Sequence, residues 1–145
     1  MEIDHLINKL GGMMREIKFR AWDKVEKKMG EVRILDFVCQ MVQVKNEKYF
    51  AMWEFENIEL LQFTGLKDKN GVDIYEGDIL EVHHHWDDYD GCSGTEKFLG
   101  VAIFKEGAFQ VSRFEKMEFY LASSIIISNE IKGNVYENPE LMEVE

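Results

Sequence analysis

The chain has 145 residues and a formal net charge of −11, and 46% of its residues are hydrophobic. This length suits one domain or two small subdomains, and this apolar content excludes a disordered tail. No apolar run approaches the roughly 20 residues that a membrane-spanning helix needs, so we expect no membrane contact. The two cysteines, Cys39 and Cys92, are expected to be reduced and unpaired, as in most cytoplasmic proteins.

The acidic residues are unevenly distributed. Residues 70–92 hold seven acids and residues 134–145 hold four, and neither segment contains a Lys or an Arg. A protein that binds a nucleic-acid duplex needs a basic footprint, so nucleic-acid binding is disfavoured. An excess of carboxylates can instead steer a protein toward a basic partner.

Two interpretations stand for residues 1–13. Apolar residues recur at helical spacing up to a Gly-Gly pair, which predicts a short amphipathic helix. These residues are Ile3, Leu6, Ile7 and Leu10. The Gly-Gly-Met-Met stretch that ends at Met14 is also what a translated ribosome-binding site and start codon give, in which case the segment is not native. Under both interpretations the segment is an appendage to the folded body.

From Ile17 onward the apolar period is two, which is typical of strands. The segment 49–56 fits a helical turn as well as a strand, and 115–123 fits a short helix or a strand. An acidic loop is expected over 86–95. Strands are expected near 17–21, 32–37, 38–44, 58–63, 72–74, 79–82, 98–104, 108–114, 124–128 and 131–136.

The most informative stretch, TGLKDKNGVDIYEGD, begins at Thr64 and is called the signature below. Asn70-Gly71 is a strong hairpin signal, and both residues tolerate positive φ, which predicts a type I′ turn. Gly77 can take a left-handed conformation in the next turn, and Asp78 can accept a backbone N–H there. We therefore interpret all four residues as structural turn residues.

Frequent short strands and a single proline predict a mostly β fold with at most short helices. The expected form is a small, partly open barrel or two barrel-like subdomains of the SH3 kind. An N-terminal β subdomain is expected over 14–60, a C-terminal barrel-like subdomain over 61–141, and an acidic tail over 142–145.

Three sequence blocks carry a resemblance to a known family. MREIKFRAWD starts at Met14, LQF starts at Leu61 and leads into the signature, and GNVYENPEL starts at Gly133. In this order and spacing the blocks resemble the YopX family, small proteins encoded mainly by phages and prophages of bacteria. The resemblance implies a mostly β fold, a phage or prophage origin and a location in the bacterial cytoplasm. It supplies no agreed catalytic residues.

One stretch has the chemistry of a metal site, namely HHHWDDYD from His83 to Asp90. On a strand, His83 and His85 point to the same side, and Asp87 or Asp88 can complete a three-ligand site with an open position for water, as a metal-dependent hydrolase or nuclease requires. A contiguous run of this kind is more typical of a solvated hairpin tip, because metal ligands usually come from distant elements. We therefore expect no cofactor, with a divalent metal as the alternative.

A second candidate is the strand face formed by Lys18, Arg20 and Trp22, opposite Ile17 and Phe19. An aromatic among basic residues can stack on a nucleic-acid base. Packing against a second subdomain or subunit is the favoured interpretation, because large aromatics are mainly buried or interfacial.

The sequence shows no nucleotide-binding glycine motif and no activated nucleophile. The leading hypothesis is a non-enzymatic module that binds a host or phage protein, with self-association through exposed strand edges also expected. The alternatives are the metal-dependent hydrolase or nuclease and a weak nucleic-acid-binding β module.

Overall fold

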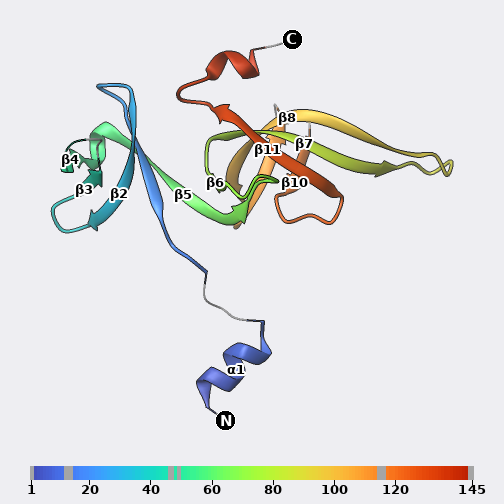
Figure 1. Ribbon diagram of the computed structural model, residues 1–145, viewed down its shortest axis with the longest axis horizontal. Helices are drawn as coiled ribbons and strands as arrows, with labels where there is room; N and C mark the ends of the chain where they lie inside the picture. The colour runs from blue at the N-terminus through green and yellow to red at the C-terminus, as the bar shows by residue number, and fades with distance from the viewer. Residues whose placement is uncertain (1, 12–14, 46–47, 49, 114–116, 144–145) are drawn as a thin grey trace.

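The computed structural model describes residues 2–11, 15–45, 48, 50–113 and 117–143, which fold mainly into two antiparallel sheets (Figure 1). The elements in chain order are α1 (Ile3–Lys9), β1 (Phe19–Asp23), β2 (Lys28–Asp36), β3 (Met41–Lys45), β4 (Phe50–Glu54), the 3₁₀ turn η1 (Phe55–Asn57), β5 (Ile58–Lys67), β6 (Asp73–Tyr75), β7 (Asp78–Asp87), β8 (Ser93–Lys105), β9 (Ala108–Arg113), β10 (Met117–Tyr120), β11 (Ile126–Asn134) and the 3₁₀ turn η2 (Pro139–Met142). The prediction of a mostly β fold with short helices is confirmed.

The N-terminal sheet has the strand order β4-β3-β2-β1-β5-β6. Its small core consists of Ala21, Val42, Val44 and Ile58, with Trp53 packed against them. Because side chains alternate along a strand, these residues all lie on one face. The terminal strands of this order do not pair with each other, so the sheet is not a closed barrel in the part of the chain that is described.

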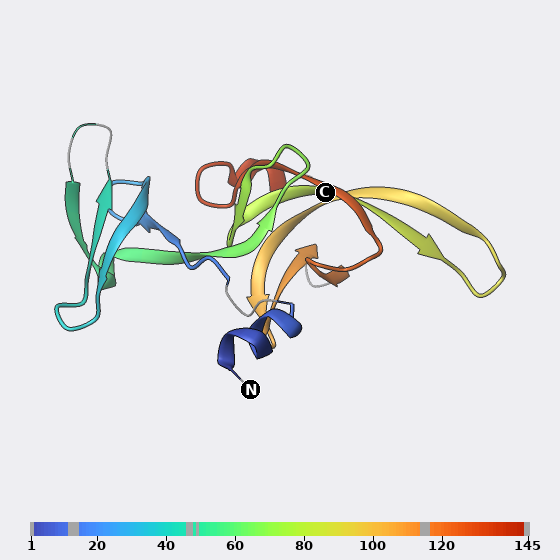
Figure 2. The same ribbon diagram turned by 60° about the horizontal axis from the view of Figure 1, so that its bottom comes forward.

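The C-terminal sheet has the order β10-β9-β8-β7-β11. Its core is larger and includes Leu80, Val82, Phe98 and Val111, and Ile74 from β6 packs into it. The strands β7 and β8 continue beyond this core as a long hairpin that projects from the body (Figures 1 and 2). We call residues 87–93 the hairpin tip.

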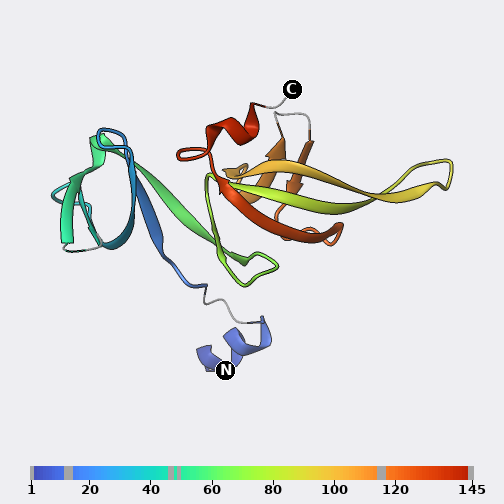
Figure 3. The same ribbon diagram turned by 45° about the horizontal axis from the view of Figure 1, so that its top comes forward.

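One strand, β5, connects the two sheets. Residues 58–62 of β5 pair with β1, while Phe63 and Lys67 pair with β6 next to the C-terminal core. The course of β5 from one sheet to the other is visible in Figure 3. The signature therefore begins inside the strand that joins both halves of the molecule.

The structure decides two segments that the sequence left open and corrects two other local predictions. The ambiguous segment 49–56 contains a strand followed by a 3₁₀ turn, and residues 117–120 of the second ambiguous segment are a strand. The two closing strands expected over 124–136 are the single strand β11, whose register with β7 shifts twice. The loop expected over 86–95 is shorter, because the β7–β8 ladder continues to Asp87 and Ser93.

The helix predicted near the N-terminus is present as α1, and none of its residues is buried. Among the described residues, we find no helix with the length and apolar character that crossing a membrane requires.

Candidate functional site

An ion pair between Arg20 on β1 and Asp78 at the start of β7 connects the two halves of the molecule. The Arg20 guanidinium carbon also lies 4.7 Å from the centre of the Tyr75 ring. Asp78 is almost fully buried, and its second oxygen accepts the Tyr75 N–H at 2.8 Å. Burial raises the pKa of Asp78, and the Arg20 charge opposes this effect. Asp78 thus accepts a backbone N–H, and the neighbouring Gly77 has a positive φ of 84°.

Lys18 and Trp22 add two more contacts across this junction. Lys18 Nζ forms an ion pair with Asp73 and lies 4.4 Å from the centre of the Phe63 ring. The hydrogen bond to Asp73 raises the pKa of Lys18, and the same bond lowers the pKa of Asp73. The Trp22 ring lies 5.5 Å from the Tyr136 ring, and Trp22 is buried.

The three residues of the predicted aromatic-basic face therefore contact the C-terminal half of the same chain. This arrangement matches the favoured interpretation of Trp22, namely packing against a second part of the molecule. A hollow of about 420 Å³ remains beside Lys18, Arg20 and Tyr75. Both cations already have carboxylate partners, so the hollow offers little positive charge to a nucleic acid. Binding at this face stays a prediction.

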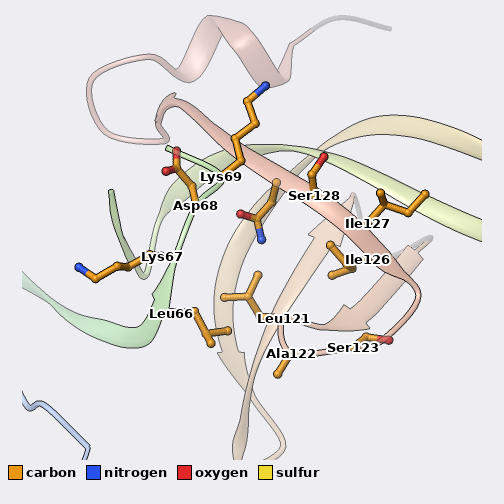
Figure 4. Close-up of a pocket in the computed structure, with 11 residues that line it drawn as sticks. Leu66, Lys67, Asp68, Lys69, Leu121, Ala122, Ser123, Ile126, Ile127 and Ser128 are labelled. Carbon is orange, nitrogen blue, oxygen red and sulfur yellow. The ribbon is translucent and has the colours of Figure 1, made fainter. Parts of the chain in front are cut away.

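A second hollow, of about 330 Å³, lies between the signature and the β10–β11 connection (Figure 4). Leu66, Leu121 and Ile126 line it with apolar surface, while Lys67 and Lys69 point away from its centre. Its lining contains no nucleophile next to a general base, so it is not a catalytic constellation.

The carboxylate beside this hollow, Asp68, holds the signature turn. One oxygen accepts the N–H groups of Asn70 and Val72, and the other accepts that of Ile131 on β11 at 3.1 Å. Burial would raise the pKa of Asp68, but these three hydrogen bonds together outweigh it and lower the pKa. Gly71 has a φ of 79° whereas Asn70 has no positive φ, so the predicted type I′ turn is wrong. The geometry is a turn followed by one left-handed residue.

The same turn occurs a second time at the hairpin tip. Asp88 accepts the N–H groups of Asp90 and Cys92 through one oxygen, and its own N–H donates to the Cys92 carbonyl. Gly91 has a φ of 80°, as Gly71 does in the signature. The tip is therefore held in a defined conformation by its own backbone and by Asp88.

Two aromatic residues mark the projecting hairpin. Tyr89 at the tip is fully exposed. Trp86 lies flat against β8 at Gly94, where an added Cβ would come within 2.9 Å of the indole. Asp87, Asp88 and Asp90 surround Tyr89 in the sequence, so the tip presents an aromatic ring among carboxylates.

The four predicted metal ligands lie on and just beyond the end of β7. His85 Nε2 pairs with Asp87 Oδ1 at 3.0 Å, while one oxygen of Asp88 holds the tip turn. The middle histidine of the run, His84, faces the other way and is buried between two aromatic rings. In the described part of the chain, no three His, Cys, Asp or Glu side chains are grouped so that they could hold a metal ion. A metal centre here stays a prediction.

The cysteines show no sign of catalytic activation. Cys39 and Cys92 are exposed and carry free thiols, as the sequence analysis expects. A hydrogen bond with Asp36 raises the pKa of the Cys39 thiol, which is the opposite of what an activated nucleophile requires.

The N-terminal sheet also has an exposed apolar surface that no sequence pattern above predicts. Phe50 and Met52 on β4 are 60% and 50% exposed, and Ile34 on β2 is 53% exposed. The register aligns Ile34 with Gln43 and Gln43 with Met52, so these side chains share one face. The available signal was the run Phe50–Trp53, which is apolar at every position and therefore places apolar side chains on both faces of a strand.

These features define a small acidic protein made of two open antiparallel sheets, with exposed aromatic and apolar surfaces and no catalytic constellation among its described residues. The family model described as "YopX protein" matches residues 18–143, so the chain belongs to the YopX family.

Two solved structures are similar to this chain. YopX from Bacillus subtilis has a TM-score of 0.59 and 20% identity, covering 91% of this chain and 99% of its own. Protein EF1440 from Enterococcus faecalis has a TM-score of 0.52 and 25% identity, covering 90% of this chain and 100% of its own. No curated protein sequence matches the chain.

Proposed function

We propose that this protein is a non-enzymatic interaction module that binds a basic partner protein through the tip of the β7–β8 hairpin. The observation that carries this proposal is the fully exposed Tyr89 at the end of a projecting hairpin, surrounded by Asp87, Asp88 and Asp90. Tyrosine is enriched among the residues that dominate binding energy at protein interfaces. The negative charge of these neighbouring aspartates favours a partner with Lys and Arg at the contact.

Two further properties support binding at the tip. The Asp88 turn fixes the tip conformation before binding, which reduces the conformational entropy lost on association. The C-terminal half is also strongly acidic, since residues 61–145 hold 17 acidic and seven basic residues. This charge draws a basic protein toward the half of the molecule that carries the hairpin.

The proposed cellular setting rests on the family. Membership of the YopX family supports a phage or prophage origin and action in the cytoplasm of the bacterial host, on a host or phage protein.

The 3₁₀ turn η1 leads into β5, which returns to pair with β1, and this connection supports the SH3-like description of the N-terminal half.

The test compares two variants of equal charge as bait in an extract of the host. The tip variant carries Tyr89→Ala, Asp87→Asn and Asp90→Asn, and the control variant carries Glu140→Gln and Glu143→Gln near the C-terminal end. We expect a stoichiometric basic protein to be retained by the native protein and by the control, and to be lost with the tip variant. Calorimetry on the purified partner then measures the loss directly. Equal retention by all three baits would refute the proposal.

A further inference from the structure

The strand β4 has a free edge. It ends the strand order of the N-terminal sheet and pairs only with β3 among the described residues. The Phe55 N–H donates to the Gln40 carbonyl at 2.9 Å, in continuation of the β3–β4 register. Hydrogen-bonded pairs alternate along an antiparallel ladder. The N–H and C=O groups of Phe50, Met52 and Glu54 therefore point outward, away from β3.

Within the described part of the chain, this edge lacks the usual protection against pairing with another strand. Natural edge strands carry Lys, Pro or a bulge, or are covered by another element. Within β4 the register with β3 is regular over five residue pairs, and Glu54 is the only charged residue. Phe50 is 60% exposed and Met52 is 50% exposed, and both lie on the face that they share with Ile34.

The charge distribution indicates which partner fits this edge. Residues 14–60 hold nine acidic and nine basic residues, so the half that contains β4 is neutral, while residues 61–145 carry the acidic excess. The strand β4 lies at the end of the molecule away from the C-terminal sheet and its hairpin in all three views (Figures 1–3). Two copies joined at β4 would keep their acidic halves at opposite ends of the assembly.

We propose that β4 pairs antiparallel with β4 of a second copy of this chain, around a two-fold axis at Met52. A strand pairs with its own copy in this way because a two-fold contact brings identical surfaces together. The longest overlap sets Met52 opposite Met52 of the partner and Phe50 opposite Glu54 of the partner, which are all residues with outward backbone groups. The two six-stranded sheets then form one continuous antiparallel sheet.

The expected dimer is weak. One short strand pair buries less area than a standard protein interface, so a weak, reversible dimer is expected. The dimer leaves the hairpin tip free, and it presents two tips to a partner. Two tips raise the avidity for a partner that has two contact sites, without any new contact.

The first test is sedimentation velocity over a series of protein concentrations. We expect the native chain to show a reversible monomer–dimer equilibrium in the micromolar range. Met52→Pro removes one outward N–H without removing a bond to β3, and Phe50→Lys places a charge at the edge. Both variants should be monomeric with an unchanged circular dichroism spectrum. The control Tyr120→Lys changes an exposed aromatic on β10, the edge strand of the other sheet, and should still dimerise.

The second test fixes the register and does not depend on a proline being tolerated. Paired residues of this kind have Cα atoms about 5.5 Å apart, which suits a disulfide. In a background without Cys39 and Cys92, Met52→Cys should form a disulfide-linked dimer on mild oxidation, whereas Glu54→Cys should not. A native chain that stays monomeric at all concentrations, or a dimer that neither Met52→Pro nor Phe50→Lys weakens, would overturn the proposal. Neither result bears on the hairpin tip, whose binding is measured separately.

Discussion

At the scale of single residues, the most informative side chains are aspartates that accept backbone N–H groups. Asp68 and Asp88 each begin a turn in which a glycine takes the left-handed conformation three residues later. The two turns share one hydrogen-bond pattern, but only Asp68 is buried and only Asp68 accepts a third N–H from a distant strand. Substitutions at the two aspartates therefore separate the contribution of the turn to stability from the contribution of the tertiary contact.

We predict that Asp68→Asn destabilises the fold by about 1–3 kcal/mol at pH 7, because it leaves a buried hydrogen-bonding group without a partner. The pKa of Asp68 is lower in the folded than in the unfolded state, where it is about 3.9. Its contribution is therefore present above about pH 4 and is lost as the pH falls through the lower folded-state pKa.

Urea denaturation at pH 7 and at lower pH values measures both effects. The loss of stability in acid should be smaller for Asp68→Asn than for the native chain. Asp88→Asn is the matched control, because it changes the same turn at an exposed position, and its effect should stay within about 0.5 kcal/mol. Equal effects of the two substitutions would show that the contact to Ile131 contributes nothing.

At the scale of elements, β1 is held on both faces. One face packs into the core of the N-terminal sheet through Ala21, and the other contacts the signature through Arg20, with Lys18 just before the strand adding a second contact. The signature thus connects β1 to β7, and its glycines and acids have structural roles. The sequence motif that identifies the family is the motif that joins the two sheets.

We predict that Arg20→Ala destabilises the fold by about 3–5 kcal/mol, because it leaves the buried Asp78 carboxylate without its counter-charge. Adding Asp78→Asn should recover part of this loss, since the remaining side chain is neutral. Thermal and urea unfolding of the single and double variants measures the coupling. Lys97→Ala removes an exposed ion pair with Glu81 and serves as the control, with an expected cost below about 1 kcal/mol. A similar cost for Arg20→Ala would contradict the buried pair.

Strand existence was predictable here, and strand pairing was not. The period of two and the turn residues predicted most strands, because local alternation reflects which face is buried. The type I′ prediction failed at Asn70 because the carboxylate of Asp68, two residues earlier, holds a different turn. The same Asp-x-x-Gly pattern at Asp88 was visible in the sequence and would have placed the tip turn.

The candidate surfaces depended on tertiary contacts that no local pattern contains. Lys18 and Arg20 looked like a free basic face, and their partners Asp73 and Asp78 lie more than fifty residues away in the sequence. The exposure of Phe50, Met52 and Ile34 depends on whether another part of the fold covers their face of the sheet, which the sequence of a single strand does not determine.

At the scale of the whole molecule, charge and apolar surface are separated. The neutral half carries the exposed face and free edge of β4, and the acidic half carries the projecting hairpin. This separation assigns self-association and partner binding to opposite ends of the molecule. It also makes the two proposed contacts respond to salt in opposite directions.

Salt screens charges over about 10 Å at 0.1 M ionic strength. Partner binding at the tip depends on attraction between the acidic half and a basic protein, so its association rate should fall as salt is added. Each copy carries a net charge of −11, so two copies repel one another at long range. Dimerisation through the neutral half should therefore strengthen as salt screens this repulsion.

Two measurements in one series of salt concentrations test this prediction. Stopped-flow mixing with the purified partner gives the association rate, and sedimentation velocity gives the dimer dissociation constant. A double variant that carries only Asp87→Asn and Asp90→Asn should flatten the salt dependence of the association rate more than that of dimerisation, because the tip lies far from β4. A dimer that dissociates on addition of salt would place charged contacts at its interface, and a pairing centred on Met52 would then be wrong.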